Sequence, residues 1–247
     1  MIENKVKFPC GDLSLEGVTA VPESKGPFPG VVVCHPHSLY GGEMNNNVVV
    51  PICLALAQAS VASLRFNFRG VGASQGKFAD GIGEKEDVAA AISYLSSLEA
   101  IDKDKIGLCG YSFGGAVSLE VAPADERVQA LALVSPEIST YVPLKQYNKP
   151  KLIICGAADQ FVSIIALQRL AQELPPPNDF ELVSGADHFW AGYEDKVAAR
   201  IAAFFVDKLK LPAKIEHIEP TEQSVSSPYV PPDDAGGMEP AADGQVH

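Results

Sequence analysis

The sequence predicts an α/β domain with a mostly parallel sheet and helices on both faces, followed by an acidic tail. Apolar runs of strand length alternate with amphipathic segments of helix length from residue 30 to residue 209, which is the pattern of strands joined by crossover helices. Residues 30–34 are apolar throughout, as expected of a strand buried on both faces. Beyond residue 210 this periodicity disappears. We therefore expect one domain over residues 1–210 and a disordered, proline-rich tail over residues 211–247.

A predicted hairpin precedes the alternating part of the chain. Residues 3–21 alternate around Cys10-Gly11-Asp12, which indicates two antiparallel strands at a sheet edge. Six further strands are expected at residues 30–34, 61–66, 106–109, 128–134, 151–155 and 180–183. Helices are expected at residues 46–59, 84–98, 115–122, 163–174 and 194–209, with Ser163 as an N-cap. Together these elements predict an eight-stranded sheet.

Composition and charge exclude several classes of partner. The 247 residues are 47% hydrophobic and 20% charged, which is sufficient for a substantial core. The formal net charge is −12, and without a basic patch neither nucleic acid nor an anionic membrane is an expected partner. No apolar run reaches membrane-spanning length and the first residues lack the apolar region of a signal peptide, so a cytoplasmic location is expected.

Two further compositional features have simple interpretations. The five cysteines are odd in number and form no C-x-x-C motif, which favours reduced thiols in the core. Residues 211–247 contain seven acidic residues and one lysine, so they contribute −6 of the net charge of −12. The alternative to a plain disordered tail is a segment that docks on a partner.

A five-residue turn, Gly110-Tyr111-Ser112-Phe113-Gly114, lies between a predicted strand and a predicted helix. This G-x-S-x-G pattern in that context is typical of a nucleophile elbow, where a strained backbone projects the serine oxygen above the sheet. Side chains two residues before and after the serine would collide with the neighbouring strand and helix, so both positions favour glycine. The alternative is a glycine-rich turn with an incidental serine.

Two later loops carry the groups that a serine nucleophile requires. A hydroxyl needs a base within hydrogen-bond reach, and the base needs an acid to orient it. Asp159 follows one predicted strand and His188 follows the last, so the chain order is Ser112, Asp159, His188, as this kind of fold requires. Asp187 is a rival acid, but adjacent side chains in an extended loop point apart. Taken singly, Asp159 could be a helix cap and His188 an exposed loop residue.

The oxyanion formed during catalysis needs backbone donors. The N–H of Phe113, directly after the serine, and that of His37, after the 30–34 strand, are the expected pair, with Ser38 as the alternate to His37. Arg69 is either a substrate contact or an ion pair that braces its loop. The candidates for contacting substrate are Ser38, Tyr40, Arg69, Tyr111 and Phe189.

Over residues 5–210 the chain resembles the α/β-hydrolase superfamily. The resemblance rests on the serine turn, on Gly156-Ala157-Ala158-Asp159 and on Gly185-Ala186-Asp187-His188. The segments 35–42 and 67–72 are similar to those of small microbial hydrolases related to dienelactone hydrolases and prolyl-oligopeptidase-type domains. The resemblance implies an α/β-hydrolase fold. Dienelactone hydrolases proper use a cysteine nucleophile, so Ser112 departs from that pattern.

The resemblance also suggests what to look for above the sheet. The superfamily usually inserts a cap after the sixth strand, but the chain from Val134 to Pro150 is too short for a helical lid. An open site is therefore expected. Tyr141, Val142 and Leu144 either line its rim or pack over the core.

These observations predict a serine hydrolase that cleaves carboxylic esters with a small acyl group through an acyl-enzyme on Ser112. No metal or cofactor is required, and the expected partner is a small-molecule ester, with a homodimer possible. Two alternatives stay open. One is a peptidase or amidase with the same triad, although no acidic pair for a substrate amine is evident in the sequence. The other is a non-catalytic binding protein with this fold.

Overall fold

The structure is a computed structural model that describes residues 1–138 and 143–209. The expected disordered tail over residues 211–247 lies outside the described residues, as do two of the candidates for the rim of the site, Tyr141 and Val142.

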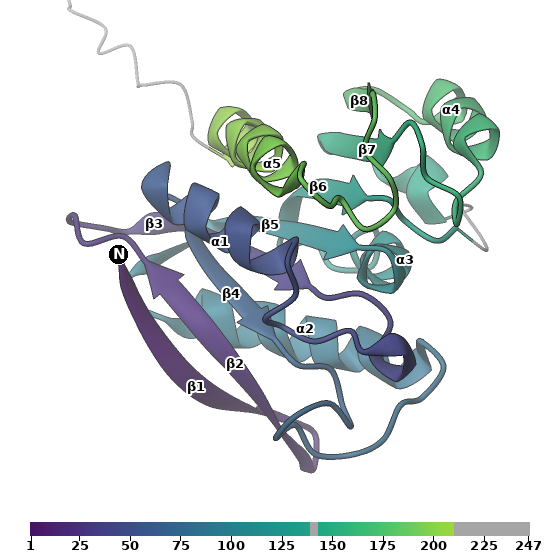
Figure 1. The fold of residues 1–247 in the computed structure, drawn as a ribbon. Helices are drawn as coiled ribbons and strands as arrows, with labels where there is room; N and C mark the ends of the chain where they lie inside the picture. The colour runs from purple at the N-terminus through teal and green to yellow at the C-terminus, as the bar shows by residue number, and fades with distance from the viewer. Residues whose placement is uncertain (139–142, 210–247) are drawn as a thin grey trace, which may run out of the picture. The chain divides into compact units, whose positions relative to one another are not determined.

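Eight strands form one sheet in the order β1-β2-β4-β3-β5-β6-β7-β8 (Figure 1). The strands are β1 (Ile2–Cys10), β2 (Leu13–Val21), β3 (Phe28–Cys34), β4 (Ala62–Phe66), β5 (Ile101–Tyr111), β6 (Val128–Val134), β7 (Lys151–Gly156) and β8 (Asn178–Val183). β2 pairs antiparallel with β1 and β4, and every other pairing in the sheet is parallel. The prediction of a mostly parallel, eight-stranded sheet is confirmed.

The hairpin at the sheet edge has a two-residue turn. Cys10 pairs with Leu13, which leaves Gly11 and Asp12 to connect the strands. Gly11 has φ +56°, a left-handed conformation that glycine adopts without steric cost and that tight hairpins require. The edge position expected for this hairpin is observed, since β1 is the first strand of the sheet.

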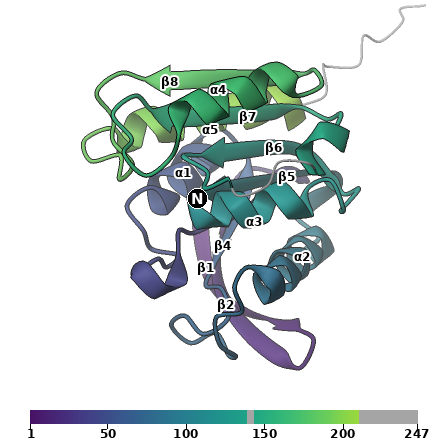
Figure 2. The ribbon, with the colours of Figure 1, turned by 90° about the vertical axis from the view of Figure 1, so that its right-hand side faces the viewer.

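Helices cover both faces of the sheet. α1 (Val49–Gln58) and α5 (Glu194–Leu209) share one apolar cluster with the strands. On the other face lie α2 (Ile82–Ser97), α3 (Phe113–Val121) and α4 (Ile164–Glu173), which come forward in Figure 2. Two short 3-10 helices, η1 (Ser38–Tyr40) and η2 (Pro143–Gln146), lie in connections. The expected cap of α4 is present, because the Ser163 side chain accepts a hydrogen bond from the N–H of Ala166 over 3.3 Å.

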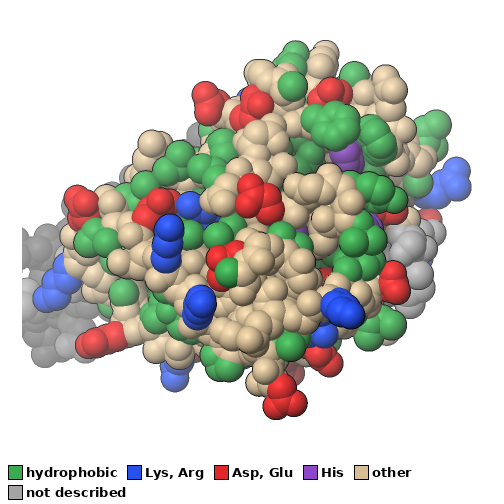
Figure 3. All heavy atoms as spheres, turned by 60° about the horizontal axis from the view of Figure 1, so that its bottom comes forward, with side chains coloured by type: hydrophobic (Ala, Val, Ile, Leu, Met, Phe, Trp, Pro, Cys, Tyr) green, Lys and Arg blue, Asp and Glu red, His purple; other side chains and the backbone are tan. Residues whose placement is uncertain are grey.

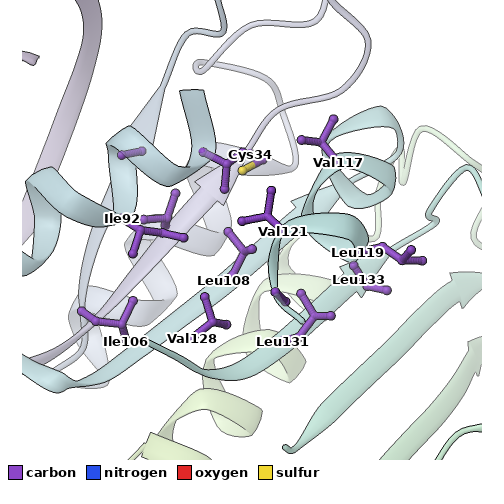
Figure 4. Packing of buried hydrophobic residues seen from close by; sticks show 14 of the residues in the cluster. Cys34, Ile92, Ile106, Leu108, Val117, Leu119, Val121, Val128, Leu131 and Leu133 are labelled. Carbon is purple, nitrogen blue, oxygen red and sulfur yellow. The ribbon is translucent and has the colours of Figure 1, made fainter. Parts of the chain in front are cut away.

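The cluster around β5, β6 and α3 fixes the strand and helix that flank the serine turn. Figure 4 shows Val117 and Val121 of α3 among the side chains of Cys34, Leu108 and Leu131. Leu108 and Leu131 are completely buried, and each such side chain contributes roughly 1.5–3 kcal/mol through removal from water. The end of β5 and the start of α3 are therefore anchored on a rigid base.

β5 starts earlier than its apolar pattern predicts. Residues 102–105 are Asp, Lys, Asp and Lys, so the expected strand began at Ile106. In the structure the strand begins at Ile101, which pairs with Phe28, and the register then shifts before Gly30. The polar residues hide this start because they lie at an irregular end of the pairing.

The connection from β6 to β7 carries no cap domain. Among its described residues, only the short helix η2 is regular structure. Leu144 in that helix is completely buried against the main core, so it packs over the core. Over residues 1–138 and 143–209, none of the helices combines the length and apolar character needed to cross a bilayer.

Candidate active site

Ser112 occupies a sharp turn between β5 and α3. Its backbone lies at φ 53° and ψ −117°, a strained conformation for a residue with a side chain. The Ser112 N–H donates to the carbonyl oxygen of Val134 over 2.9 Å, which ties the turn to the next strand. The turn thus has the backbone geometry that the sequence pattern predicts for a nucleophile elbow.

The two glycines of the motif are required by close backbone contacts. A Cβ on Gly110 would collide with the carbonyl oxygen of Gly114. A Cβ on Gly114 would lie 2.5 Å from the carbonyl oxygen of His35 and 2.6 Å from that of Cys34. Because backbone atoms cannot move aside cheaply, no larger residue fits at either position without shifting the turn.

Ser112, His188 and Asp159 form a continuous hydrogen-bonded chain. Ser112 Oγ lies 3.0 Å from His188 Nε2, and His188 Nδ1 lies 2.9 Å from Asp159 Oδ2. The carboxylate can only accept, so Nδ1 carries the proton and Nε2 is left to accept from the Ser112 hydroxyl. The structure therefore brings together three side chains that are 29 and 76 residues apart along the chain.

Asp159 is held in its ionised form. Burial pushes the pKa of this carboxyl upward, but the hydrogen bond from His188 and those from nearby groups outweigh it and lower the pKa. The N–H groups of Phe161 and Val162 donate to the other carboxylate oxygen over 2.9 and 3.2 Å. The rival acid Asp187 instead accepts a hydrogen bond from the N–H of Phe189.

Two hydrogen bonds hold the loop that carries His188. The hydroxyl of buried Tyr111, a candidate for contacting substrate, donates to the carbonyl oxygen of His188 over 2.8 Å. Trp190 is completely buried and its indole N–H donates to the Ser135 hydroxyl over 3.2 Å. Tyr111 therefore positions the histidine from below, and the structure places its hydroxyl away from solvent.

The two expected oxyanion donors, the N–H groups of His37 and Phe113, belong to residues whose rings contact each other. The rings of His37 and Phe113 have centroids 4.8 Å apart. Among the hydrogen bonds formed by the described part of the chain, the backbone N–H of neither residue donates to another protein group. Both N–H groups are therefore available to an oxyanion.

His35, which the sequence analysis passed over, braces the loop that carries His37. Its Nε2 accepts from the N–H of Phe68 over 3.1 Å, and its Nδ1 lies 2.6 Å from the carbonyl oxygen of Pro36. Burial lowers the pKa of His35 to about 4, so the ring is neutral near pH 7. The available signal was its place directly after a wholly buried strand, at the start of the loop.

Arg69 makes the bracing ion pair. Its guanidinium contacts Asp87 over 2.8 Å and Glu86 over 3.0 Å, and its backbone N–H donates to Asp87 over 2.9 Å. The Asp87 side chain is completely buried, and its hydrogen bond to Arg69 raises the pKa of the guanidinium. Arg69 thus joins the loop after β4 to α2, in line with the second of its two expected roles.

Two hollows lie near the residues of the candidate site, although Ser112 itself lines neither. The larger, of about 510 Å³, is lined by His37, Leu39, Tyr40, Phe78, Asp80, Gly81, Ile82, Lys85, Phe113, Ala116, Val117, Glu120 and Glu137. The smaller, of about 150 Å³, is lined by Pro136, Glu137, Ile138, Phe161, Val162, Ser163, Ala166 and Leu167. On the face drawn in Figure 3, histidine atoms reach the surface among hydrophobic side chains.

The remaining candidates differ in their surroundings. Tyr40 is 86% exposed and lines the larger hollow. The Ser38 hydroxyl is buried without a hydrogen-bond partner among the described residues. Phe189 is exposed beside the ring of His188, with centroids 5.7 Å apart. Phe161, which the sequence analysis did not single out, lies closer to that ring, at 4.9 Å.

Comparisons with known proteins place the chain in a family. The model of the dienelactone hydrolase family matches residues 73–205, a range that includes Ser112, Asp159 and His188. An uncharacterised protein of Rickettsia prowazekii is 33% identical over 172 residues, which cover 66% of this chain and 72% of that protein.

Two solved structures described as serine hydrolases are also similar to this chain. An alpha-beta serine hydrolase homologue from Coxiella burnetii superposes with a TM-score of 0.75 at 32% identity, covering 82% of this chain and 97% of that one. A serine hydrolase without a lid from Xanthomonas campestris has a TM-score of 0.75 at 27% identity, covering 85% of this chain and 96% of that one.

Proposed function

This chain belongs to the dienelactone hydrolase family of α/β hydrolases, and we propose that it is a serine hydrolase that cleaves carboxylic esters through an acyl-enzyme on Ser112. The observation that carries the proposal is the hydrogen-bonded chain from Ser112 through His188 to Asp159, with contacts of 3.0 and 2.9 Å. In this series of hydrogen bonds the histidine can accept the proton of the serine hydroxyl, and the aspartate holds the histidine in one tautomer.

The first half of the reaction forms the acyl-enzyme. Ser112 Oγ attacks the ester carbonyl carbon while its proton passes to His188 Nε2. The N–H groups of Phe113 and His37 donate to the oxyanion, and the start of α3 adds its positive dipole end. Asp159 stabilises the imidazolium. When the tetrahedral intermediate collapses, the bond to the leaving alkoxide breaks and His188 gives that oxygen the proton.

The second half regenerates the enzyme. Water attacks the acyl carbon as His188 takes one of its protons, and the carboxylic acid leaves as Ser112 Oγ recovers that proton. The lidless site supports this proposal, since water reaches the acyl-enzyme without a conformational opening. A serine hydroxyl needs a neighbouring base to act as a nucleophile. His188 lies in that position beside Ser112.

The test is hydrolysis of p-nitrophenyl acetate, butyrate and octanoate by the wild-type protein and by Ser112→Ala. A matched control is Ser24→Ala, because Ser24 is exposed in the connection between β2 and β3. Saturable turnover is expected in the wild type and the control and should vanish in Ser112→Ala. Phenylmethylsulfonyl fluoride should add one sulfonyl group, located at Ser112 by peptide mass analysis.

Two results would overturn the proposal. Turnover that survives Ser112→Ala would mean that another group is the nucleophile. A correctly folded wild type that reacts with the sulfonyl fluoride but cleaves only p-nitroanilides would instead identify an amidase with the same triad.

A further inference from the structure

The two hollows lie beside different parts of the candidate site. The larger one is lined by both oxyanion residues, His37 and Phe113. The smaller one is lined by Phe161, whose ring packs on His188 with centroids 4.9 Å apart. Glu137 lines both hollows, and its backbone N–H lies 3.4 Å from the Ser112 carbonyl oxygen. Ser112 itself lines neither hollow, and the residue that they share, Glu137, contacts the backbone of the turn that carries the nucleophile.

The chemistry of ester cleavage decides which part of the substrate enters each hollow. The leaving oxygen must lie within reach of His188 Nε2, because that nitrogen returns the proton. The leaving group therefore extends toward Phe161. The acyl chain, on the opposite side of the tetrahedral carbon, extends past Phe113. We propose that the larger hollow binds the acyl group and selects a bulky, aromatic acyl group without negative charge, while the smaller binds a compact leaving group.

This inference rests on the proposed function and makes it more specific. The larger hollow, at about 510 Å³, is far bigger than a small acyl group needs. It therefore departs from the small acyl group that the sequence suggested. A volume in this range is typical of sites that take whole small molecules.

The walls of the larger hollow suit an aromatic ring. The imidazole of His37 has its centroid 5.0 Å from that of Phe78 and 4.8 Å from that of Phe113. Ala116 and Val117 of α3 add apolar side chains to its lining. Aromatic rings at these separations favour a further ring in a stacked or edge-on position.

The charge around the larger hollow is negative. Three carboxylates, Asp80, Glu120 and Glu137, line it with one cation, Lys85. Lys85 is paired with Glu120 over 2.8 Å, and within the described ranges neither of the other two acids forms an ion pair. An acyl group that carries its own carboxylate is therefore repelled.

The test uses matched tryptophan substitutions. Ala116→Trp fills the larger hollow from α3, and Ala166→Trp fills the smaller one from α4. Gln172→Trp, at an exposed position on α4 away from both, is the control. For each variant, kcat/KM is measured with p-nitrophenyl benzoate and p-nitrophenyl acetate, and the ratio of the two is the readout.

Ala116→Trp is expected to lower the benzoate-to-acetate ratio by about tenfold or more, since a blocked pocket discriminates at least as strongly as a missing methylene. Ala166→Trp should leave that ratio unchanged, and Gln172→Trp should change neither ratio nor rate. Ile82→Trp gives a second substitution in the larger hollow that does not depend on core packing, because Ile82 is 71% exposed.

The charge is tested with p-nitrophenyl 4-carboxybenzoate. Glu137→Gln should raise its kcat/KM relative to the benzoate by about two- to fivefold, the range of a partly screened charge pair. A benzoate-to-acetate ratio that falls in Ala166→Trp but not in Ala116→Trp or Ile82→Trp would overturn the assignment while leaving the esterase proposal intact. If the wild type hydrolyses none of these esters, both the assignment of the hollows and the esterase proposal are overturned.

Discussion

The ring of His35 accepts a hydrogen bond from the backbone N–H of Phe68 over 3.1 Å. This bond joins the loop after β3, which carries His37, to the loop after β4, which carries Arg69. Both residues are completely buried, so water cannot replace the bond. The position of one proposed oxyanion donor thus depends on a neutral imidazole two residues before it.

Protonation of His35 is expected to destabilise the fold in acid. Its pKa is lowered to about 4 from an ordinary value of 6.5, so the unfolded chain binds more protons between these values. Its contribution is full above pH 6.5 and is lost as the pH falls through 4, by up to about 3 kcal/mol. Urea unfolding at pH 7.5 and 4.5 should show a smaller difference in the free energy of unfolding for His35→Gln than for the wild type. Equal differences would contradict this.

Asp159, and not its rival Asp187, is expected to orient the catalytic histidine. Asp159→Asn should lower kcat by about two to four orders of magnitude, because an amide can hold His188 in the wrong tautomer. Asp187→Asn should leave kcat nearly unchanged, since within the described residues the Asp187 side chain accepts from the N–H of Phe189, as an asparagine oxygen also does. Steady-state kinetics on p-nitrophenyl acetate compares the two. Equal losses of kcat in the two variants would contradict a specific role for the Asp159 carboxylate in orienting His188.

Gly114→Ala is expected to destabilise the protein strongly. The added Cβ would lie 2.5 Å from the carbonyl oxygen of His35, and relieving such overpacking costs about 1–3 kcal/mol or more. Gly192→Ala is the comparison, because nothing lies within 4 Å of the new Cβ and only its backbone, at φ +78°, is unfavourable for a side chain. Its cost is the backbone strain alone, about 1 kcal/mol. Thermal unfolding of both variants should rank them in this order.

The five cysteines are expected to react with thiol reagents only after unfolding. All five are free and buried, and burial raises the pKa of each thiol, to about 11 for Cys10 and Cys53 and about 12 for Cys34 and Cys155. Few thiolates are therefore present at pH 8. Titration with a chromogenic disulfide should detect five thiols in guanidinium chloride and react slowly in buffer. Rapid labelling of the native protein at one site would contradict this.

Arg69→Met is expected to affect stability more than substrate binding. It would leave the completely buried carboxylate of Asp87 without its cation, and breaking such a pair costs about 3–5 kcal/mol. The double variant with Asp87→Asn should be less destabilised than the sum of the two single changes. Urea denaturation measures the cycle. A raised KM with unchanged stability would instead support the substrate-contact role.

Much of the fold followed from local patterns. The bounds expected for β6 and α5, 128–134 and 194–209, are those observed, because each is a continuous apolar run or an amphipathic segment with clear ends. The start of β5 was missed because charged residues at 102–105 interrupt the pattern where pairing is irregular.

The triad candidates could be named from their order along the chain, because parallel strands place their C-terminal loops at one edge of the sheet. The supporting residues could not. Tyr111 and His188 are 77 positions apart, and His35 and Phe68 are 33 apart. No periodicity relates such pairs, so nothing local indicates that their polar groups meet.

The sequence by itself determined the sheet, its helices and the loops on which Ser112, Asp159 and His188 lie. The reason is that burial of one or both faces of an element requires apolar residues at a regular spacing along the chain. Only the tertiary structure decided that Arg69 braces a loop and that two unequal hollows lie near the candidate site, one beside Phe113 and one beside Phe161. Those features arise where side chains from distant loops pack against one another, and their shapes depend on contacts that no single segment encodes.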